Sequence, residues 1–258
     1  MPDTQIGAQL YTLRDHTKTP DDIARTFERV KAMGYDAVQC SALGPIASDA
    51  LAQRLRDTGL QCAATHVSME QLQETQACLE HHAALDCQFT AIGGAGLHPQ
   101  WSAEDWIGYA HRLSAVAQPL NEAGVRVGYH NHSHELALHD GRRPMDLLAE
   151  YCDPCVWLEV DTYWIAHGGG DPAAWIDRIA ATGPDRVPCI HVKDMDVTAE
   201  SAQFMSEVGA GNLNWPAILD ACRRASTRWY LVERDGGPVE AFESLAISLR
   251  NMREMGLR

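Results

Sequence analysis

The chain has 258 residues, 45% of them hydrophobic, and a formal net charge of −14, so it can bury the core of one domain of the size usual for a (β/α)8 barrel. So acidic a chain repels phosphate backbones and anionic lipids, which argues against nucleic acid and membrane partners. No segment approaches the ~20 apolar residues that span a bilayer, and the N-terminus does not resemble a signal peptide, so we expect a cytoplasmic protein.

Strand-like and helix-like runs alternate along the whole chain. The expected strands are residues 5–11, 36–40, 61–66, 89–93, 126–130, 156–161, 188–193 and 228–233. The expected helices are residues 21–30, 48–58, 70–84, 103–122, 145–151, 172–180, 216–224 and 239–255. Eight βα units without a linker predict one closed parallel barrel, a single-domain α/β fold of the (β/α)8 TIM type over residues 1–258.

The residues expected to end helices also agree with a barrel. Gly34, Gly59 and Gly124 stand where helices should end, each just before a strand. The competing α/β fold, a doubly wound open sheet, usually has a Gly-rich phosphate turn after its first strand. Residues 12–16 are Thr-Leu-Arg-Asp-His instead, which favours the barrel.

The eight cysteines are scattered along the chain. Dispersed thiols in a chain of this length are typical of small buried hydrophobic residues and not of a disulfide framework. Cys152 and Cys155 have CxxC spacing, but the Asp-Pro between them predicts a turn, and the sequence has no second CxxC to complete a zinc site.

Four acidic or imidazole side chains stand at or just past the ends of the last four expected strands. They are Glu135, Asp161, His191 and Glu233. Because the C-terminal ends of barrel strands converge at one mouth, we expect these side chains to meet there. Three carboxylates and one imidazole suit a hard or borderline divalent metal. The sequence therefore predicts a metalloenzyme.

Two glutamates on opposite sides of such a metal can act as a catalytic pair. Either Glu135 or Glu233 would remove a proton next to a carbonyl while the other donates one to the opposite face. The metal would polarise the oxygen and hold the resulting enediolate. Removal of the metal should abolish turnover.

Four further residues are expected to bind substrate at the mouth. His66 ends the third strand, and the alternative to substrate contact is a hydrogen-bonded role behind the ligands. Lys193 shares a strand face with His191, and the alternative is a salt bridge to a neighbouring carboxylate. His132 belongs to a run in which histidines alternate at strand spacing, and Trp164 could stack on a sugar ring, although packing under a loop is the commoner role.

Residues 209–215, Gly-Ala-Gly-Asn-Leu-Asn-Trp, follow the seventh expected strand. Barrels often bind phosphate at this position. The segment has no Lys or Arg, which leaves the phosphate question open.

These motifs resemble the xylose-isomerase-like TIM barrels, also called the sugar phosphate isomerase/epimerase family. The likeness covers nearly the whole chain. It is carried by Ile-Gly-Ala-Gln-Leu-Tyr-Thr-Leu-Arg at 6–14, Tyr-His-Asn-His-Ser-His-Glu at 129–135, Leu-Glu-Val-Asp-Thr-Tyr-Trp at 158–164, His-Val-Lys-Asp at 191–194, residues 208–215, and Leu-Val-Glu-Arg-Asp at 231–235.

The resemblance implies that Glu135, Asp161, His191 and Glu233 bind one divalent metal, with manganese expected first and cobalt, magnesium or zinc as alternatives. It also implies that the two glutamates are the acid/base pair. Many relatives form dimers or tetramers, so a homo-oligomer is a further implication.

Two departures from the family pattern narrow the expectation. Ketose 3-epimerases of this family carry a substrate-contacting histidine where Trp164 stands and an arginine where Val197 stands, which argues against a free ketose as substrate. The Tyr-His-Asn-His signature favours the subgroup of inosose-dehydratase-like proteins and enzymes acting on 3-oxo sugars or 3-oxo-glycosides. Endonuclease IV shares the barrel but requires a histidine at the Trp164 position, and the net charge of −14 argues further against DNA repair.

The sequence thus predicts a metal-dependent enzyme that isomerises or epimerises a monosaccharide or its oxidised derivative. A lyase or dehydratase acting on a 3-oxo-glycoside or inosose is the first alternative, because it would use the same metal and base. A non-catalytic sugar-binding barrel that keeps its metal is the second.

Overall fold

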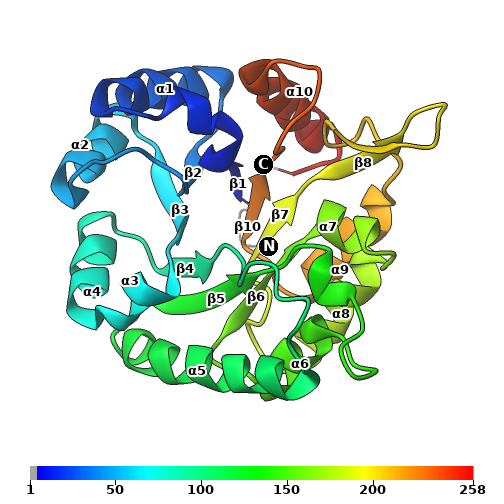
Figure 1. The fold of residues 1–258 in the computed structure, drawn as a ribbon. Coiled ribbons are helices and arrows are strands. Elements are labelled where there is room, and N and C mark those ends of the chain that lie inside the picture. The colour runs from blue at the N-terminus through cyan, green and yellow to red at the C-terminus, as the bar shows by residue number, and fades with distance from the viewer. Residues whose placement is uncertain (1–4, 258) are drawn as a thin grey trace.

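Eight parallel strands close into a barrel in the computed structural model, which describes residues 5–257 (Figure 1). In chain order they are β1 (Gln5–Gln9), β2 (Ala37–Cys40), β3 (Gln61–His66), β4 (Phe89–Ile92), β5 (Arg126–His130), β6 (Trp157–Asp161), β7 (Cys189–Val192) and β10 (Trp229–Val232). The order around the ring is β1-β10-β7-β6-β5-β4-β3-β2, and β1 closes the ring by pairing in parallel with both β10 and β2. The predicted single-domain (β/α)8 barrel is confirmed.

Helices form the outer layer around this barrel (Figure 1). They are α1 (Pro20–Met33), α2 (Ser48–Thr58), α3 (Met69–Gln73), α4 (Thr75–Ala84), α5 (Ala103–Glu122), α6 (Pro144–Tyr151), α7 (Thr162–His167), α8 (Pro172–Ala180), α9 (Trp215–Arg224) and α10 (Ala241–Glu254). Helix α1 illustrates why they form: Thr19 and Asp22 make a reciprocal capping box, and Ile23, Phe27 and Val30 are buried along one face.

The barrel interior is apolar at the end where the strands begin. The Trp157 ring lies there, edge-on to Phe89 with ring centroids 5.9 Å apart, and its indole N–H donates to the Arg126 carbonyl oxygen at 3.1 Å. Gly128 leaves room for this ring, because a Cβ at that position would collide with it. A closed apolar floor leaves the opposite end, where the strands finish, as the place for polar chemistry.

Four features of the structure differ from the expected element pattern. The expected first strand stops at Gln9, whose side chain accepts from the Tyr11 N–H and begins a 3-10 helix, η1 (Leu10–His16). The expected helix 70–84 is divided at Glu74, whose backbone is not helical. The short helix α7 starts directly on Asp161, which caps it by accepting from the Trp164 N–H. The chain between β7 and α9 forms an antiparallel hairpin outside the barrel, made of β8 (Asp194–Val197) and β9 (Gln203–Ser206).

All eight cysteines are free thiols, and seven of them are buried. Within residues 5–257, none of the helices combines the length and apolar character needed to cross a bilayer.

Candidate metal centre

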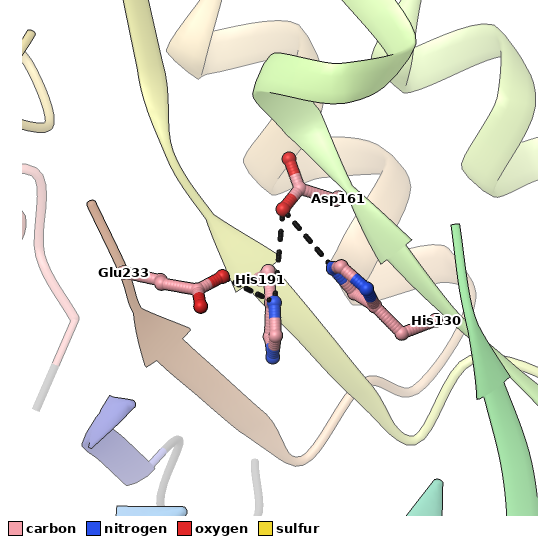
Figure 2. A group of neighbouring side chains, drawn as sticks. All are labelled: His130, Asp161, His191 and Glu233. Carbon is pink, nitrogen blue, oxygen red and sulfur yellow. Dashed lines mark hydrogen bonds and ion pairs between the residues drawn. The ribbon is translucent and has the colours of Figure 1, made fainter. Parts of the chain in front are cut away.

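The side chains of His130, Asp161, His191 and Glu233 converge at the mouth of the barrel (Figure 2). They come from β5, β6, β7 and the residue after β10, which are neighbours around the ring. Each offers one ligand atom, and these four atoms lie within 4.8 Å of one another. All four residues are buried. We call this set the tetrad.

The contacts inside the tetrad run through Asp161 and His191. Oδ2 of Asp161 lies 3.2 Å from Nε2 of His130 and 3.6 Å from Nδ1 of His191. Nδ1 of His191 lies 2.8 Å from Oε2 of Glu233. Two imidazole nitrogens and two carboxylate oxygens therefore face a common point.

The tetrad fits a divalent cation by its composition and by the close spacing of its donor atoms. Among residues 5–257, Nδ1 of His191 and Oε2 of Glu233 are buried without a properly oriented hydrogen-bond partner. These two atoms lie 2.8 Å from each other, and the Lys193 ammonium group lies 2.7 Å from Glu233 Oε2, so this carboxylate already faces positive charge. Mixed imidazole and carboxylate donors suit manganese, cobalt or zinc better than magnesium, which prefers oxygen alone.

Lys193 lies beside the tetrad and carries its own positive charge. Its Nζ lies 3.1 Å from Asp161 Oδ2, 2.7 Å from Glu233 Oε2 and 3.0 Å from Asp235 Oδ1. Burial alone would lower the pKa of this ammonium group, but the three carboxylates outweigh burial and raise it, so Lys193 is protonated. Its charge and the hydrogen bond from His130 in turn hold the pKa of Asp161 well below its usual range, although burial acts the other way.

A second layer of polar residues fixes the His191 ring from below. Nε2 of His191 lies 2.6 Å from Gln39 Oε1 and 3.4 Å from Glu159 Oε1. Gln39 itself donates to Glu159 at 2.9 Å and accepts from Gln9 at 2.8 Å. With the Nε2 proton directed at these acceptors, Nδ1 is the ring nitrogen that faces the tetrad.

Glu159 is a carboxylate beside the tetrad that the sequence analysis did not single out. It is fully buried, and it also accepts from His66 Nε2 at 2.7 Å. Burial would raise the pKa of its carboxyl, but His191 and His66 outweigh this and lower it well below the usual range. Strand periodicity could have found it, because Glu159 stands two residues before Asp161 and so shares its inward face.

Glu135, predicted as the fourth ligand and as half of the catalytic pair, lies outside the tetrad. It belongs to the short 3-10 helix η2 (His134–Leu136) and is fully buried. Its carboxylate accepts from the Tyr129 hydroxyl at 2.6 Å and from the His132 backbone N–H at 2.8 Å, and it pairs with His134 Nε2 at 3.1 Å. In this arrangement His130, and not Glu135, is grouped with Asp161, His191 and Glu233 within 4.8 Å.

A cavity of about 550 Å³ lies above the tetrad, and we call it the mouth cavity. All four residues predicted to bind substrate line it: His66, His132, Trp164 and Lys193. His66 does so while its Nε2 is held by Glu159, as the hydrogen-bonded alternative expected. Nδ1 of His132 and Nε1 of Trp164 are buried without partners among residues 5–257. Both rings border the cavity while these two nitrogen atoms are covered by the protein.

The loop at residues 209–215 wraps around a side chain of the protein itself. Oδ2 of Asp194 accepts from the backbone N–H groups of Gly209 at 2.8 Å and Gly211 at 3.1 Å and from the Trp215 indole at 2.6 Å. Oδ1 accepts from the backbone N–H groups of Met195 at 2.8 Å and Leu213 at 3.2 Å. This carboxylate joins the hairpin β8–β9 to the start of α9.

Comparison with solved structures supports the same architecture. The barrel is similar to a sugar phosphate isomerase/epimerase from Parabacteroides distasonis, with a TM-score of 0.81 and 21% identity over 98% of this chain and 94% of that one. It is also similar to the probable 3-DHS dehydratase AsbF from Bacillus anthracis, with a TM-score of 0.70 and 13% identity over 96% of this chain and 98% of that one.

Among curated proteins, the chain is 28% identical over 158 residues to the rhizopine catabolism protein MocC of Rhizobium meliloti. That match covers 55% of this chain and 47% of the relative, so it spans about half the length of the curated protein. The model of the xylose isomerase-like TIM barrel family matches residues 27–255, which include every member of the tetrad. By this match and by its closed eight-stranded barrel, the chain belongs to the xylose isomerase-like TIM barrel family.

Proposed function

We propose that this protein is a divalent-metal-dependent enzyme that isomerises or epimerises a small sugar or an oxidised sugar derivative. The observation that carries the proposal is the tetrad, four buried donor atoms within 4.8 Å of one another at the mouth of the barrel. A divalent ion held there, manganese first among the candidates, would supply a Lewis acid that polarises a substrate carbonyl.

We assign His130, Asp161, His191 and Glu233 as the ligands, so that His130 takes the place that the sequence analysis gave to Glu135. Lys193 contacts Asp161 and Glu233, two of these ligands. Its third contact, with Asp235 at 3.0 Å, lets the ammonium group stay paired when the ligand carboxylates turn to an ion.

Proton transfer needs groups on two sides of the substrate. Glu233 borders the mouth cavity from the β10 side, and His132 borders it from the β5 side with an unpaired Nδ1. We assign Glu233 as the base that removes the proton next to the carbonyl and His132 as the opposing group. Glu135 is then a positioning residue, because it accepts the His132 backbone N–H at 2.8 Å and fixes the loop that presents this ring.

Lys193 supports the same step through its charge. A buried ammonium group at the cavity wall stabilises the negative charge that develops on the carbonyl oxygen when the neighbouring proton leaves. Trp164 lies over this group, with Nζ 5.6 Å from the ring centroid, and its ring offers a flat face to a sugar. The mouth cavity thus combines a base, a cation and a stacking surface.

The test is solvent exchange at carbon. The manganese-loaded protein is incubated in D2O with keto, aldo and 3-oxo sugars, and each sugar is analysed by NMR and mass spectrometry. We expect deuterium at the carbon next to the carbonyl of one sugar class, with loss of this exchange in Glu233→Gln and after metal removal. Full activity of Glu233→Gln with bound metal, or no exchange on any sugar, would contradict the proposal.

A lyase or dehydratase remains the second candidate, because it begins with the same proton removal and then expels a leaving group from the next carbon. An additional cavity beside the tetrad, described below, gives such a group a place. Product mass separates the two: loss of water or of a substituent indicates elimination, and an unchanged mass indicates isomerisation. Tight sugar binding with no turnover would favour a binding protein instead.

A further inference from the structure

A second cavity of about 610 Å³ opens beside the mouth cavity, and we call it the side lobe. It lies between the loop after β2, the end of β3 and the helices α2, α3 and α4. The two cavities share five lining residues: Ser41, Ala42, His66, Val67 and Gln71. The two cavities are therefore adjacent, with these five residues at their common border.

We propose that the side lobe binds an apolar, ring-sized substituent of the substrate, so that the substrate is a sugar joined to such a group and not a free monosaccharide. This inference rests on the proposed function, because it places the sugar itself above the tetrad. Each cavity alone falls in the range of about 300–1,000 Å³ typical of small-molecule sites. The side lobe thus has room for a chemical group of its own.

The walls of the side lobe offer apolar surface. Leu43, Ile46 and Val67 line it and are only partly buried, although each packs against the core. Leu51 and Cys78 form part of the deeper wall. Covering such surface with an apolar group stabilises a complex by about 25 cal/mol for each Å² removed from water.

The two histidines that face the side lobe are paired within the protein, whereas the Glu74 carboxylate also lines it. His82 uses both ring nitrogens, at 2.9 Å from Thr65 Oγ1 and 2.7 Å from the Cys78 carbonyl oxygen. Nδ1 of His81 lies 2.8 Å from the Ser48 hydroxyl. A sugar ring placed here would lose its hydrogen bonds to water and find few replacements, whereas an apolar group loses none. The side lobe therefore suits an apolar group better than a sugar ring, which belongs in the mouth cavity.

His66 marks the junction between the two cavities. Nε2 of this ring is bound to Glu159, which lies next to His191, and Nδ1 lies 3.3 Å from the Ser41 hydroxyl. The ring is thus held in place from both sides, with 13% of its side chain exposed. A fixed residue at the junction orients the bond between the sugar and its substituent.

The experiment measures binding, so that it does not depend on turnover. Manganese-loaded protein is titrated by calorimetry with glucose, galactose and xylose and with their 4-nitrophenyl glycosides. We expect at least one 4-nitrophenyl glycoside to bind at least about tenfold more tightly than its parent sugar, given the apolar area available.

Two alanines of α4 give a matched pair of variants. Ala77 lines the side lobe, whereas Ala83 is exposed on the same helix and does not line it. Ala77→Trp should fill the lobe and abolish the preference for the 4-nitrophenyl glycosides, and Ala83→Trp should leave it unchanged. Ile46→Trp, on the loop after β2, fills the lobe from the other side and serves if Ala77→Trp does not fold.

The inference is overturned if no 4-nitrophenyl glycoside binds more tightly than its parent sugar, or if the preference survives in both lobe-filling variants. Manganese content and deuterium exchange on unsubstituted sugars are measured on the same samples. If these succeed while the glycoside preference is absent, the proposed function stands and the side lobe alone is wrong. If these fail as well, the proposed function fails with it.

Discussion

His130 and Asp161 face each other from the adjacent strands β5 and β6, with Nε2 and Oδ2 separated by 3.2 Å (Figure 2). Glu135 lies only five residues further along the chain, yet its carboxylate is bound to Tyr129 and His132. The first prediction concerns which of the two residues holds the ion. Loss of a residue that only supports a ligand typically weakens metal binding by about 10–100-fold. We expect His130→Ala, which removes a ligand, to weaken manganese binding by more than about 100-fold, and Glu135→Gln to retain manganese.

Manganese per chain, measured by elemental analysis and by calorimetric titration, checks this prediction. Asp161→Ala and His191→Ala serve as positive controls, because both should lose the ion. Normal binding by His130→Ala together with loss in Glu135→Gln would return the fourth ligand position to Glu135.

Glu159 should influence the ion without touching it. Glu159→Gln keeps the volume but removes the charge that holds the His191 and His66 rings. We expect manganese affinity to fall by about 10–100-fold. The control is Glu150→Gln on α6, which removes a surface carboxylate paired with Arg142 and should leave affinity unchanged. An unchanged affinity in Glu159→Gln would show that Gln39 alone orients His191.

Substitution of Lys193 should slow turnover without weakening metal binding. Lys193→Met removes the cation that lies 2.7 Å from Glu233 and leaves the four ligands in place. We expect kcat to fall by about 10²–10³-fold, the usual effect of losing one group that stabilises a developing oxyanion. Manganese affinity should stay the same or rise, because the tetrad becomes more negative. A kcat near that of the unmodified enzyme would remove Lys193 from the mechanism.

The pair of His134 and Glu135 should make stability depend on pH. Burial would lower the pKa of His134, but Glu135 outweighs burial and raises this pKa above 6.5. Burial would raise the pKa of Glu135, but the hydrogen bond from His134, its charge and further hydrogen bonding lower this pKa below 4.5. A raised histidine pKa adds stability below its unfolded value that is lost as pH rises through the folded value. A lowered carboxyl pKa adds stability above its unfolded value that is lost as pH falls through the folded value.

Both contributions are therefore present at about pH 5.5. Without metal, the unmodified protein should have a higher Tm than His134→Gln, and we expect the largest difference near this pH. The difference should shrink as the pH rises above the folded pKa of His134. His111→Gln, at an exposed position of α5, is the control and should give a flat difference. A difference for His134→Gln that grows with pH would contradict the assignment.

The floor of the barrel should tolerate no added volume at Gly128. A methyl group there would meet the Trp157 ring, and overpacking of a core costs about 1–3 kcal/mol. We expect Gly128→Ala to lower the free energy of unfolding by this amount in urea. Gly236→Ala is the control, because a Cβ there meets nothing within 4 Å. Equal stability of the two variants would mean that Trp157 can move aside.

The strand ends could be read from the sequence because the chemistry there follows strand periodicity. Asp161 and His191 lie on apolar runs, so their inward direction follows from alternation, and Glu233 comes directly after such a run. His130 obeys the same rule as the last residue of β5, with Gly128 on the same inward face. The sequence analysis chose Glu135 as the fourth ligand, and the first prediction above compares that choice with His130.

The position of Glu135 depends on contacts that no local pattern encodes. It follows from the path of the loop after β5, which returns the carboxylate to the Tyr129 hydroxyl and the His132 backbone. The hairpin β8–β9 escaped prediction for a related reason. Its strands have only four residues each, and the hairpin is tied by a tertiary contact from Asp194 to the loop at 209–215.

That contact also bears on the kind of sugar the protein can accept. In a barrel that grips a phosphorylated ligand after its seventh strand, free backbone amides would receive the phosphate oxygens. Here the amides of Gly209, Gly211 and Leu213 are already taken by Asp194. A phosphate group would have to displace this carboxylate, which belongs to the same chain and therefore binds the amides at a high effective concentration. The Asp194 carboxylate thus occupies the position where this loop would bind a phosphate group. A sugar without a phosphate group does not have to displace it.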